Sequence, residues 1–198
     1  DYHPCVCAKQ PRTQRCCVQK GMVHNGTMQA LDGVRVLDLS RVLAGPWCTQ
    51  ILADLGADVV KVEPPGRGET GRTVNVSYDD LKNGVDSWYF ISLNANKKSI
   101  TLNLKADEGK AIFLRLADTA DVVVEGFRPG VAARLGADYA TLSAASPRLV
   151  YCSISGFGQT GPYKDRAALD LILQAESGMI SVTGTPGGDY VRCGVSIA

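Results

Sequence analysis

Several features that would place this 198-residue chain in a familiar class are missing from its sequence. No window approaches the run of about 18 apolar residues that a membrane-spanning helix needs, and the first twenty residues hold no apolar segment typical of a signal peptide. Neither sign of charge predominates, because 21 Lys and Arg offset 20 Asp and Glu to a net charge of +1. We therefore expect a soluble, cytoplasmic protein whose main partner is neither nucleic acid nor a membrane.

The seven cysteines lack the paired C-x-x-C spacing that makes a zinc site a strong prediction. Four of them crowd residues 5–17, and with the two histidines, His3 and His24, they leave a metal site open as an alternative to no metal. The other three are Cys48, Cys152 and Cys193. Their scatter is typical of reduced, buried side chains in a cytosolic protein. We expect no bound metal, and we interpret residues 1–27 as a disordered leader or non-native extension before a globular part at 28–198.

From residue 31 onward, β-branched apolar runs alternate with helical patterns, and 45% apolar content is sufficient for one sizeable core. Strands are expected at 34–39, 58–62, 99–104, 121–125 and 148–154. Helices are expected at 44–55, from 107 onward with Ile112, Phe113 and Leu116 as its buried stripe, at 129–135, at 139–145, and after the glycine-rich loop that starts at 156. The order strand, short helix, strand predicts parallel strands at the start. The whole pattern predicts an α/β, Rossmann-like, mainly parallel sheet flanked by helices. Residues 64–86 are expected to form a long, functional surface loop.

The commonest function of such a fold, nucleotide-dependent redox chemistry, is not supported by the motifs. The turn after the first strand, at 40–46, has no G-x-G-x-x-G to bring the backbone against a pyrophosphate. The glycine-rich stretch at 183–188 follows a helix and lacks the Lys of a P-loop, so it is predicted to be a turn.

One carboxylate stands out. Asp170 follows a Gly/Pro loop and lies near the start of an apolar helix, among Ala, Leu and Ile. Two interpretations fit such an acid: a charge at a helix start, where the backbone N–H groups favour an anion, or a nucleophile.

Five blocks, in order, carry a resemblance that covers about 170 residues. They are L-D-G at 31–33 with V-L-D-L-S at 36–40, A-G-P at 44–46 with V-K-V-E at 60–63, N-A-N-K-K-S-I at 94–100, E-G-F-R-P-G at 125–130 with R-L-G at 134–136, and the loop and helix at 156–178. Together they resemble the N-terminal half of the class III CoA-transferases, the formyl-CoA, carnitine-CoA and succinyl-CoA:glutarate transferase group.

The resemblance implies an activity. Asp170 matches the family's nucleophile, which attacks an acyl-CoA thioester to give a mixed anhydride. The released CoA thiolate reopens the anhydride to an enzyme-bound CoA thioester, and an acceptor carboxylate reverses these steps. The substrates implied are an acyl-CoA and a small acid, such as a dicarboxylic acid. No permanent cofactor is implied, since CoA is a substrate.

The resemblance also implies CoA contacts. By family position, the candidates are Arg41, Val42, Ala44, Phe127 and Arg134, and Phe157 of the glycine-rich loop is a further one. Lys97 and Lys98 are weaker candidates, and Arg72 lies in the long loop. The glycines Gly156, Gly158 and Gly161 are expected to let their loop approach the thioester closely.

Other features limit the implied function. Leu43 stands where formyl-CoA enzymes have an active-site Gln, which disfavours formyl-CoA:oxalate specificity. Family members continue into a second domain and form interlocked homodimers, so this sequence corresponds to a truncated large domain whose activity alone stays open. An α-methylacyl-CoA racemase-like isomerase is one alternative, although no His lies beside Asp170. An inactive CoA-binding fragment is the other.

Overall fold

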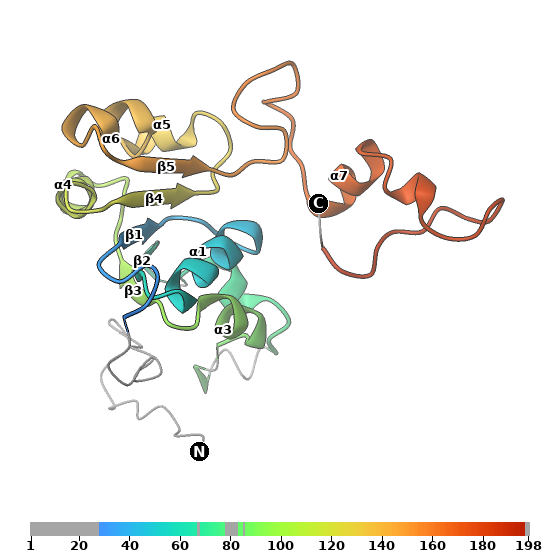
Figure 1. Cartoon of the computed structure of the whole chain (residues 1–198), viewed down its shortest axis with the longest axis horizontal. Coiled ribbons are helices and arrows are strands. Elements are labelled where there is room, and N and C mark those ends of the chain that lie inside the picture. Colours follow the sequence, from blue (N-terminus) through green and yellow to red (C-terminus); the bar gives the residue numbers. More distant parts are fainter. Residues whose placement is uncertain (1–27, 67, 78–82, 85, 197–198) are drawn as a thin grey trace.

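Five short runs rich in β-branched residues form the sheet of the computed structural model, which describes residues 28–66, 68–77, 83–84 and 86–196 (Figure 1). The strands are β1 (Arg35–Asp38), β2 (Asp58–Glu63), β3 (Lys98–Thr101), β4 (Val122–Glu125) and β5 (Val150–Ser153). They lie in the order β3-β2-β1-β4-β5, and every neighbouring pair is parallel. The predicted α/β class is confirmed. The expected leader, residues 1–27, and its alternative metal site lie outside the described residues.

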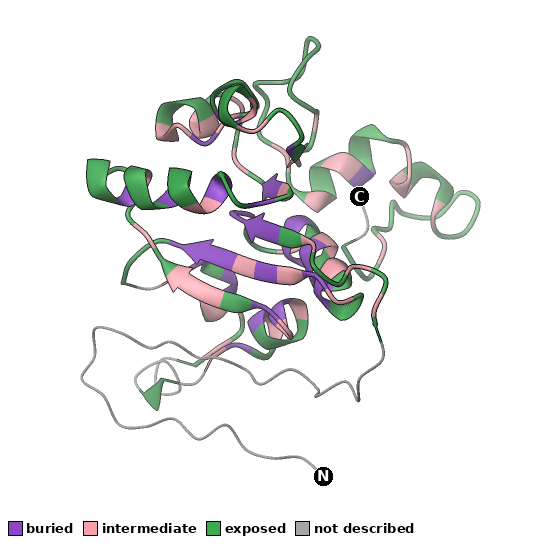
Figure 2. Cartoon of the chain, turned by 60° about the vertical axis from the view of Figure 1, so that its left-hand side comes forward, coloured by how far each residue is buried: buried purple, intermediate pink, exposed green. Residues whose placement is uncertain are grey.

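Helices cover both faces of this sheet (Figures 1 and 2). On one face lie α1 (Ala44–Asp54) and α3 (Trp88–Asn94), and on the other α4 (Asp107–Ala117), α5 (Val131–Leu135) and α6 (Tyr139–Ala145). Because successive strand residues point to opposite faces, Val36 packs with Ala53 of α1, whereas Leu37 packs with Phe113 of α4. Burial of both faces explains why apolar residues stand next to one another in β1, β2 and β4 and do not alternate with polar ones.

The buried stripe of α4 differs from the expectation. Phe113 is fully buried and Leu116 is partly buried, as expected, but Ile112 is exposed. The inward face is formed by Gly109, Phe113 and Ala117, which are spaced by one turn each. Gly109 fits there because a β-carbon at this position would overlap with the carbonyl oxygen of Asn103.

The helix α3 was not predicted from the sequence. Its N-cap is Ser87, whose side chain accepts a hydrogen bond from the backbone N–H of Tyr89. Only Phe90 and Asn94 of this helix are buried, so the apolar periodicity that identifies a helix is weak here.

The connections fix where ligands can approach the sheet. The chain moves outward from β1 to β2 and β3, and then returns to place β4 on the other side of β1. Loops that follow β1 and β4 therefore diverge, which is the usual binding position in open α/β sheets. After β5 the chain leaves the sheet for α7 (Asp170–Glu176) and η2 (Ile180–Val182), which lie apart from the other helices (Figure 1).

None of the helices in the described part of the chain has the length and apolar character needed to span a bilayer.

Candidate active site

A pocket of about 690 Å³ opens at the carboxyl edge of the sheet. Segments that follow β1, β2, β3 and β4 line it together with α4 and α5. Its apolar lining includes Leu39, Val62, Leu102, Leu104, Phe127 and Leu135, and its cations are Arg41, Lys105, Lys110 and Arg134. Four cations beside an apolar surface are suited to a ligand that combines phosphate groups with a flat ring.

The side chains of Arg41 and Phe127 meet in this pocket. The guanidinium carbon of Arg41 lies 5.3 Å from the centre of the Phe127 ring, within the range of a cation–π contact. The loop of Phe127 is fixed by the buried Glu125, whose carboxylate accepts hydrogen bonds from the backbone N–H of Phe127, at 2.6 Å, and from the Ser153 hydroxyl. A flat cation and an aromatic ring thus come together from the two diverging loops.

The structure brings three of the sequence-predicted residues together in the pocket: Arg41, Phe127 and Arg134. Lys105 and Lys110 were missed. The signal that could have found them is their place, since Lys105 follows β3 and Lys110 lies in the first turn and a half of α4, at the same edge of the sheet.

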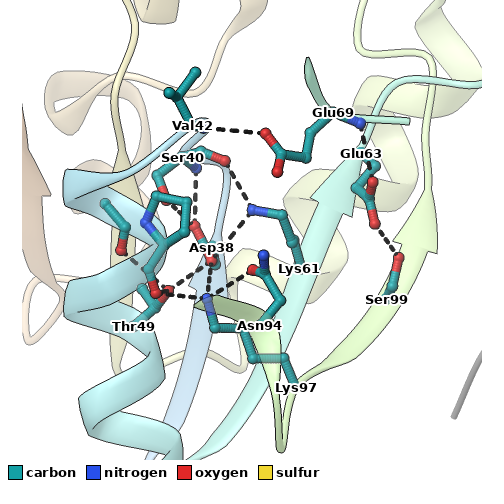
Figure 3. Close-up of polar contacts among 12 residues, drawn as sticks. Asp38, Ser40, Val42, Thr49, Lys61, Glu63, Glu69, Asn94, Lys97 and Ser99 are labelled. Atoms are coloured by element: carbon teal, nitrogen blue, oxygen red, sulfur yellow. Dashed lines mark hydrogen bonds and ion pairs between the residues drawn. The ribbon is translucent and has the colours of Figure 1, made fainter. Parts of the chain in front are cut away.

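The turn after β1, which carries Arg41, rests on a buried charge cluster (Figure 3). The Asp38 carboxylate at the end of β1 accepts hydrogen bonds from the Ser40 backbone N–H at 2.9 Å and from the Thr49 hydroxyl at 2.6 Å. Two buried ammonium groups pair with it: Lys97 at 3.2 Å and Lys61 at 3.6 Å. Lys61 also donates to the backbone carbonyl of Ser40 at 2.9 Å, and Lys97 donates to that of Pro46 at 2.7 Å.

The cluster shifts two ionisation equilibria. Burial opposes the ionisation of Asp38, but Lys61 and Lys97 and the hydrogen bonds to its carboxylate hold the pKa of Asp38 below its ordinary value. Burial lowers the pKa of Lys97 to about 8, although Asp38 favours its charged form. Lys97 is therefore engaged inside the protein and is not presented to the pocket.

Val42 and Ala44 follow Arg41 directly, but the pocket lining does not include them. Val42 has a φ of +69°, a left-handed conformation that is unfavourable for a β-branched residue. Its backbone N–H donates to the Glu69 carboxylate at 3.1 Å, which helps to hold the turn (Figure 3). Ala44 is the first residue of α1.

Two other predicted cations lie elsewhere. Lys98 pairs with Asp58 at 2.6 Å, at the amino ends of β2 and β3 and thus at the opposite edge of the sheet from the pocket. Arg72 forms a fork with Glu63, with two distances of 2.6 Å, and also pairs with Asp86 at 2.9 Å. Its guanidinium covers the Phe90 ring at 3.7 Å. The structure does not bring either residue together with Arg41.

The glycine-rich loop leads from β5 to Asp170, which is the first residue of α7. A β-carbon on Gly156 would overlap with Ala168, so glycine allows the start of the loop to lie against the segment before Asp170. Gly158 and Gly161 have φ values of +78° and +87°, which favour glycine. Phe157 contacts the ring of Tyr163 and the guanidinium of Arg166 within the same loop, at 5.8 and 5.1 Å.

Asp170 is partly exposed, and its Oδ2 accepts a hydrogen bond of 2.6 Å from the Gln174 amide one turn later. Such a carboxylate can act as a nucleophile or as a proton acceptor. Across the described ranges, no group of three or more His, Cys, Asp or Glu side chains is arranged to hold a metal ion.

Comparison with known proteins gives consistent matches. The model of CoA-transferase family III matches residues 31–198. A succinate–glutarate CoA-transferase of Agrobacterium fabrum is 47% identical over 170 residues, which are 85% of this chain and 42% of that protein. An acetyl-CoA:oxalate CoA-transferase of Acetobacter aceti is 49% identical over 163 residues, which are 82% of this chain and 41% of that protein.

Among solved structures, a CAIB/BAIF family protein from Brucella suis superposes with a TM-score of 0.78 at 42% identity. The match covers 85% of this chain and 44% of that one. The chain therefore spans about two fifths of the length of these relatives and of this solved structure.

Proposed function

The chain belongs to CoA-transferase family III, and from this premise we propose that the full-length protein moves CoA from an acyl-CoA thioester to a carboxylic acid, with Asp170 as the nucleophile. The observation that carries the proposal is the pocket at the carboxyl edge of the sheet, where the Arg41 guanidinium makes a cation–π contact with Phe127 among three further cations. Its volume, its charges and its flat surfaces fit the nucleotide part of CoA.

The four cations of this pocket have two different tasks. Arg41 and Phe127 present flat surfaces on which adenine can stack, while Arg134, Lys105 and Lys110 supply positive charge for the phosphates. Val42 and Ala44 contribute through the backbone of the turn, and Phe157 through the glycine-rich loop. We leave Lys98 out of this site, because it is paired with Asp58 at the opposite edge of the sheet.

The chemistry follows from a carboxylate that attacks a thioester. One oxygen of Asp170 forms a bond to the acyl carbon, and the C–S bond breaks to release CoA as a thiolate. The thiolate then attacks the Asp170 side-chain carbon of the mixed anhydride and expels the donor carboxylate, leaving an aspartyl-CoA thioester. An acceptor carboxylate repeats the two steps in reverse and leaves as its CoA thioester, so the energy of the thioester bond is passed on and is not lost to hydrolysis.

We further propose that residues 28–198 form the N-terminal part of the large domain, and that the full-length protein adds a second domain and forms an interlocked homodimer. Relatives of nearly equal identity act on different acids, glutarate and succinate in one case and oxalate in another, by their names. A small dicarboxylic acid is thus the acceptor class that we propose.

The decisive variant is Asp170→Asn in the full-length protein. An amide keeps the shape of the side chain and loses the nucleophile, so CoA transfer should be abolished while CoA binding is retained. Transfer is measured with a panel of acyl-CoA donors and carboxylate acceptors, and binding by calorimetry. Incubation of wild type with acyl-CoA followed by hydroxylamine should modify Asp170, which mass spectrometry of peptides would identify.

Asp165→Asn is the matched control, because Asp165 is an exposed acid on the same loop. This variant should keep wild-type turnover and the same labelled peptide. Full transfer activity in Asp170→Asn would overturn the mechanism. Exchange of deuterium at the α-carbon of an acyl-CoA without CoA transfer would instead support an isomerase.

A further inference from the structure

Gln174 is the most deeply buried side chain of α7, with no exposed surface. Three apolar residues near it in the sequence are exposed instead: Leu169 by 79%, Leu171 by 50% and Ile172 by 43%. Burying an amide is unfavourable unless its groups are hydrogen-bonded, so a polar residue at this position needs a specific reason.

Both ends of the Gln174 amide have partners. Its Nε2 donates to Asp170 Oδ2 at 2.6 Å, and its Oε1 accepts from the backbone N–H of Cys193 at 2.9 Å. A backbone N–H can only donate, so the carbonyl end of the amide must face Cys193. The NH2 end is therefore directed at Asp170, and the segment at 193–195 keeps it there.

From this geometry we infer that Gln174 is the hydrogen-bond donor that holds Oδ2 of Asp170 and stabilises the negative charge on this oxygen when the aspartyl carbon is attacked. The inference rests on the proposed function, in which Asp170 is the nucleophile. It assigns Oδ2 as the oxygen that stays a carbonyl and Oδ1 as the oxygen that bonds to the acyl group.

The electron balance of the second step shows where the donor acts. The CoA thiolate adds to the side-chain carbon of acylated Asp170, and the C=O electron pair moves onto Oδ2. The tetrahedral intermediate then collapses, the pair returns to form the carbonyl, and the bond from carbon to Oδ1 breaks to release the donor carboxylate. Charge develops on Oδ2 in this step and again when the acceptor carboxylate attacks, whereas the first attack places the developing oxyanion on the acyl group. A donor aimed at Oδ2 should therefore favour the steps at the aspartyl carbon.

The test separates these steps in the full-length enzyme. Wild type and Gln174→Met are mixed with acyl-CoA, quenched at intervals and analysed by intact mass, which distinguishes the acylated enzyme from the aspartyl-CoA thioester. We expect Gln174→Met to form the aspartyl-CoA thioester about 10²–10³-fold more slowly, the usual effect of removing one oxyanion donor. The KM for acyl-CoA should change little, and acylated enzyme should accumulate.

Gln50→Met is the matched control. Gln50 is also buried and donates to an aspartate one turn later, Asp54, at 2.7 Å, but on α1. It should show the cost of losing a buried amide without the change in thioester formation. If Gln174→Met and Gln50→Met lose the same stability and form the thioester at the same rate, the inference is wrong while the proposed function stands. If wild type itself gives no adduct on Asp170, the proposed function fails first.

A second variant, Gln174→Glu, tests the inference even if Gln174→Met fails to fold. In Gln174→Glu the introduced carboxyl donates a hydrogen bond only when protonated, and its proximity to Asp170 favours the protonated form. Thioester formation should therefore rise as the pH falls from 8 to 5.5, compared with wild type at each pH. A pH profile parallel to that of wild type would contradict the donor role.

Discussion

Arg41 and Phe127 are 86 positions apart, yet their side chains touch because β1 and β4 are neighbours at the point where the strand order reverses. The contact depends on a planar cation. A guanidinium can stack on a ring and still donate hydrogen bonds along its edges, whereas an ammonium is a compact, strongly hydrated charge. Arg41 is thus more than a positive charge at the pocket.

We predict that Arg41→Lys weakens CoA binding by the full-length protein roughly tenfold, or about 1–2 kcal/mol, because the charge is kept and the planar surface of the guanidinium is lost. Arg134→Ala should weaken it by a similar factor. Calorimetric titration with CoA is the measurement. Lys98→Ala is the control, since Lys98 lies at the opposite edge of the sheet, and it should bind CoA as wild type does. A loss in Lys98→Ala equal to that in Arg41→Lys would move the nucleotide site away from this pocket.

Single residues also show what the sequence could not reveal. The family resemblance pointed to Arg41, Phe127 and Arg134 because they lie in recognisable blocks or directly beside one. Lys105 and Lys110 look like ordinary solvated lysines until β3 and α4 are placed around the pocket. Gln174 gave no signal at all, because its burial and orientation depend on Cys193, nineteen residues later.

Between elements, the ammonium of Lys97 joins three parts of the fold. It lies within hydrogen-bond distance of Asp38 at the end of β1, of Asn94 in α3, and of the carbonyl of Pro46 in α1. Glu69 and Lys61 also act on its charge. This arrangement connects the turn that carries Arg41 to the helix that the sequence did not predict.

Stability should depend on pH through this group. In the folded protein, burial lowers the pKa of Lys97 to about 8, whereas an unfolded lysine titrates near 10.4. Between these values the unfolded chain binds a proton that the folded protein does not, so this group makes folding more favourable as the pH rises. Relative to Lys97→Met, wild type should gain on the order of 3 kcal/mol between pH 7.5 and 10.5.

Urea unfolding across this pH range measures the difference. Lys98→Met serves as the control, because the neighbouring lysine has a largely exposed side chain and pairs only at the surface. The Lys98→Met curve should run parallel to that of wild type. A constant difference between wild type and Lys97→Met at all pH values would show that Lys97 has the same pKa in the folded and the unfolded protein, which contradicts the prediction.

The elements themselves were largely predictable where the periodicity was strong. The five strands and α1, α4 and α6 follow from runs of apolar and β-branched residues and from helix-start signals, with boundaries that moved by at most three residues. The prediction for the inward face of α4 was wrong because a glycine inside a helix gives no apolar signal. Gly109 nevertheless faces inward, since its close contact with Asn103 leaves no space for a β-carbon. The local sequence pattern of a helix does not show which of its faces a neighbouring segment will contact.

At the scale of the whole molecule, the described segment beyond β5, up to residue 196, is poorly covered by the rest of the fold. Large apolar side chains stay exposed along it: Leu169 by 79%, Val182 by 84%, Tyr190 by 85% and Val195 by 67%. Soluble monomers rarely present a large apolar surface of this kind, because water contact with it is unfavourable. In the proposed full-length protein, this surface is where the second domain or the partner subunit would pack.

We therefore predict that the 198-residue chain alone binds the dye ANS and sediments as oligomers, whereas the full-length protein shows neither behaviour. Val182→Lys together with Tyr190→Lys should reduce both dye binding and association, because charged side chains disfavour burial of this segment. The comparison variant is Ile51→Lys, which places the same charge on the exposed face of α1. If the dye signal falls with Ile51→Lys and not with the double variant, the apolar surface that binds the dye lies on α1. If the unmodified chain runs as a clean monomer without dye binding, the segment beyond β5 folds back in solution and needs no partner.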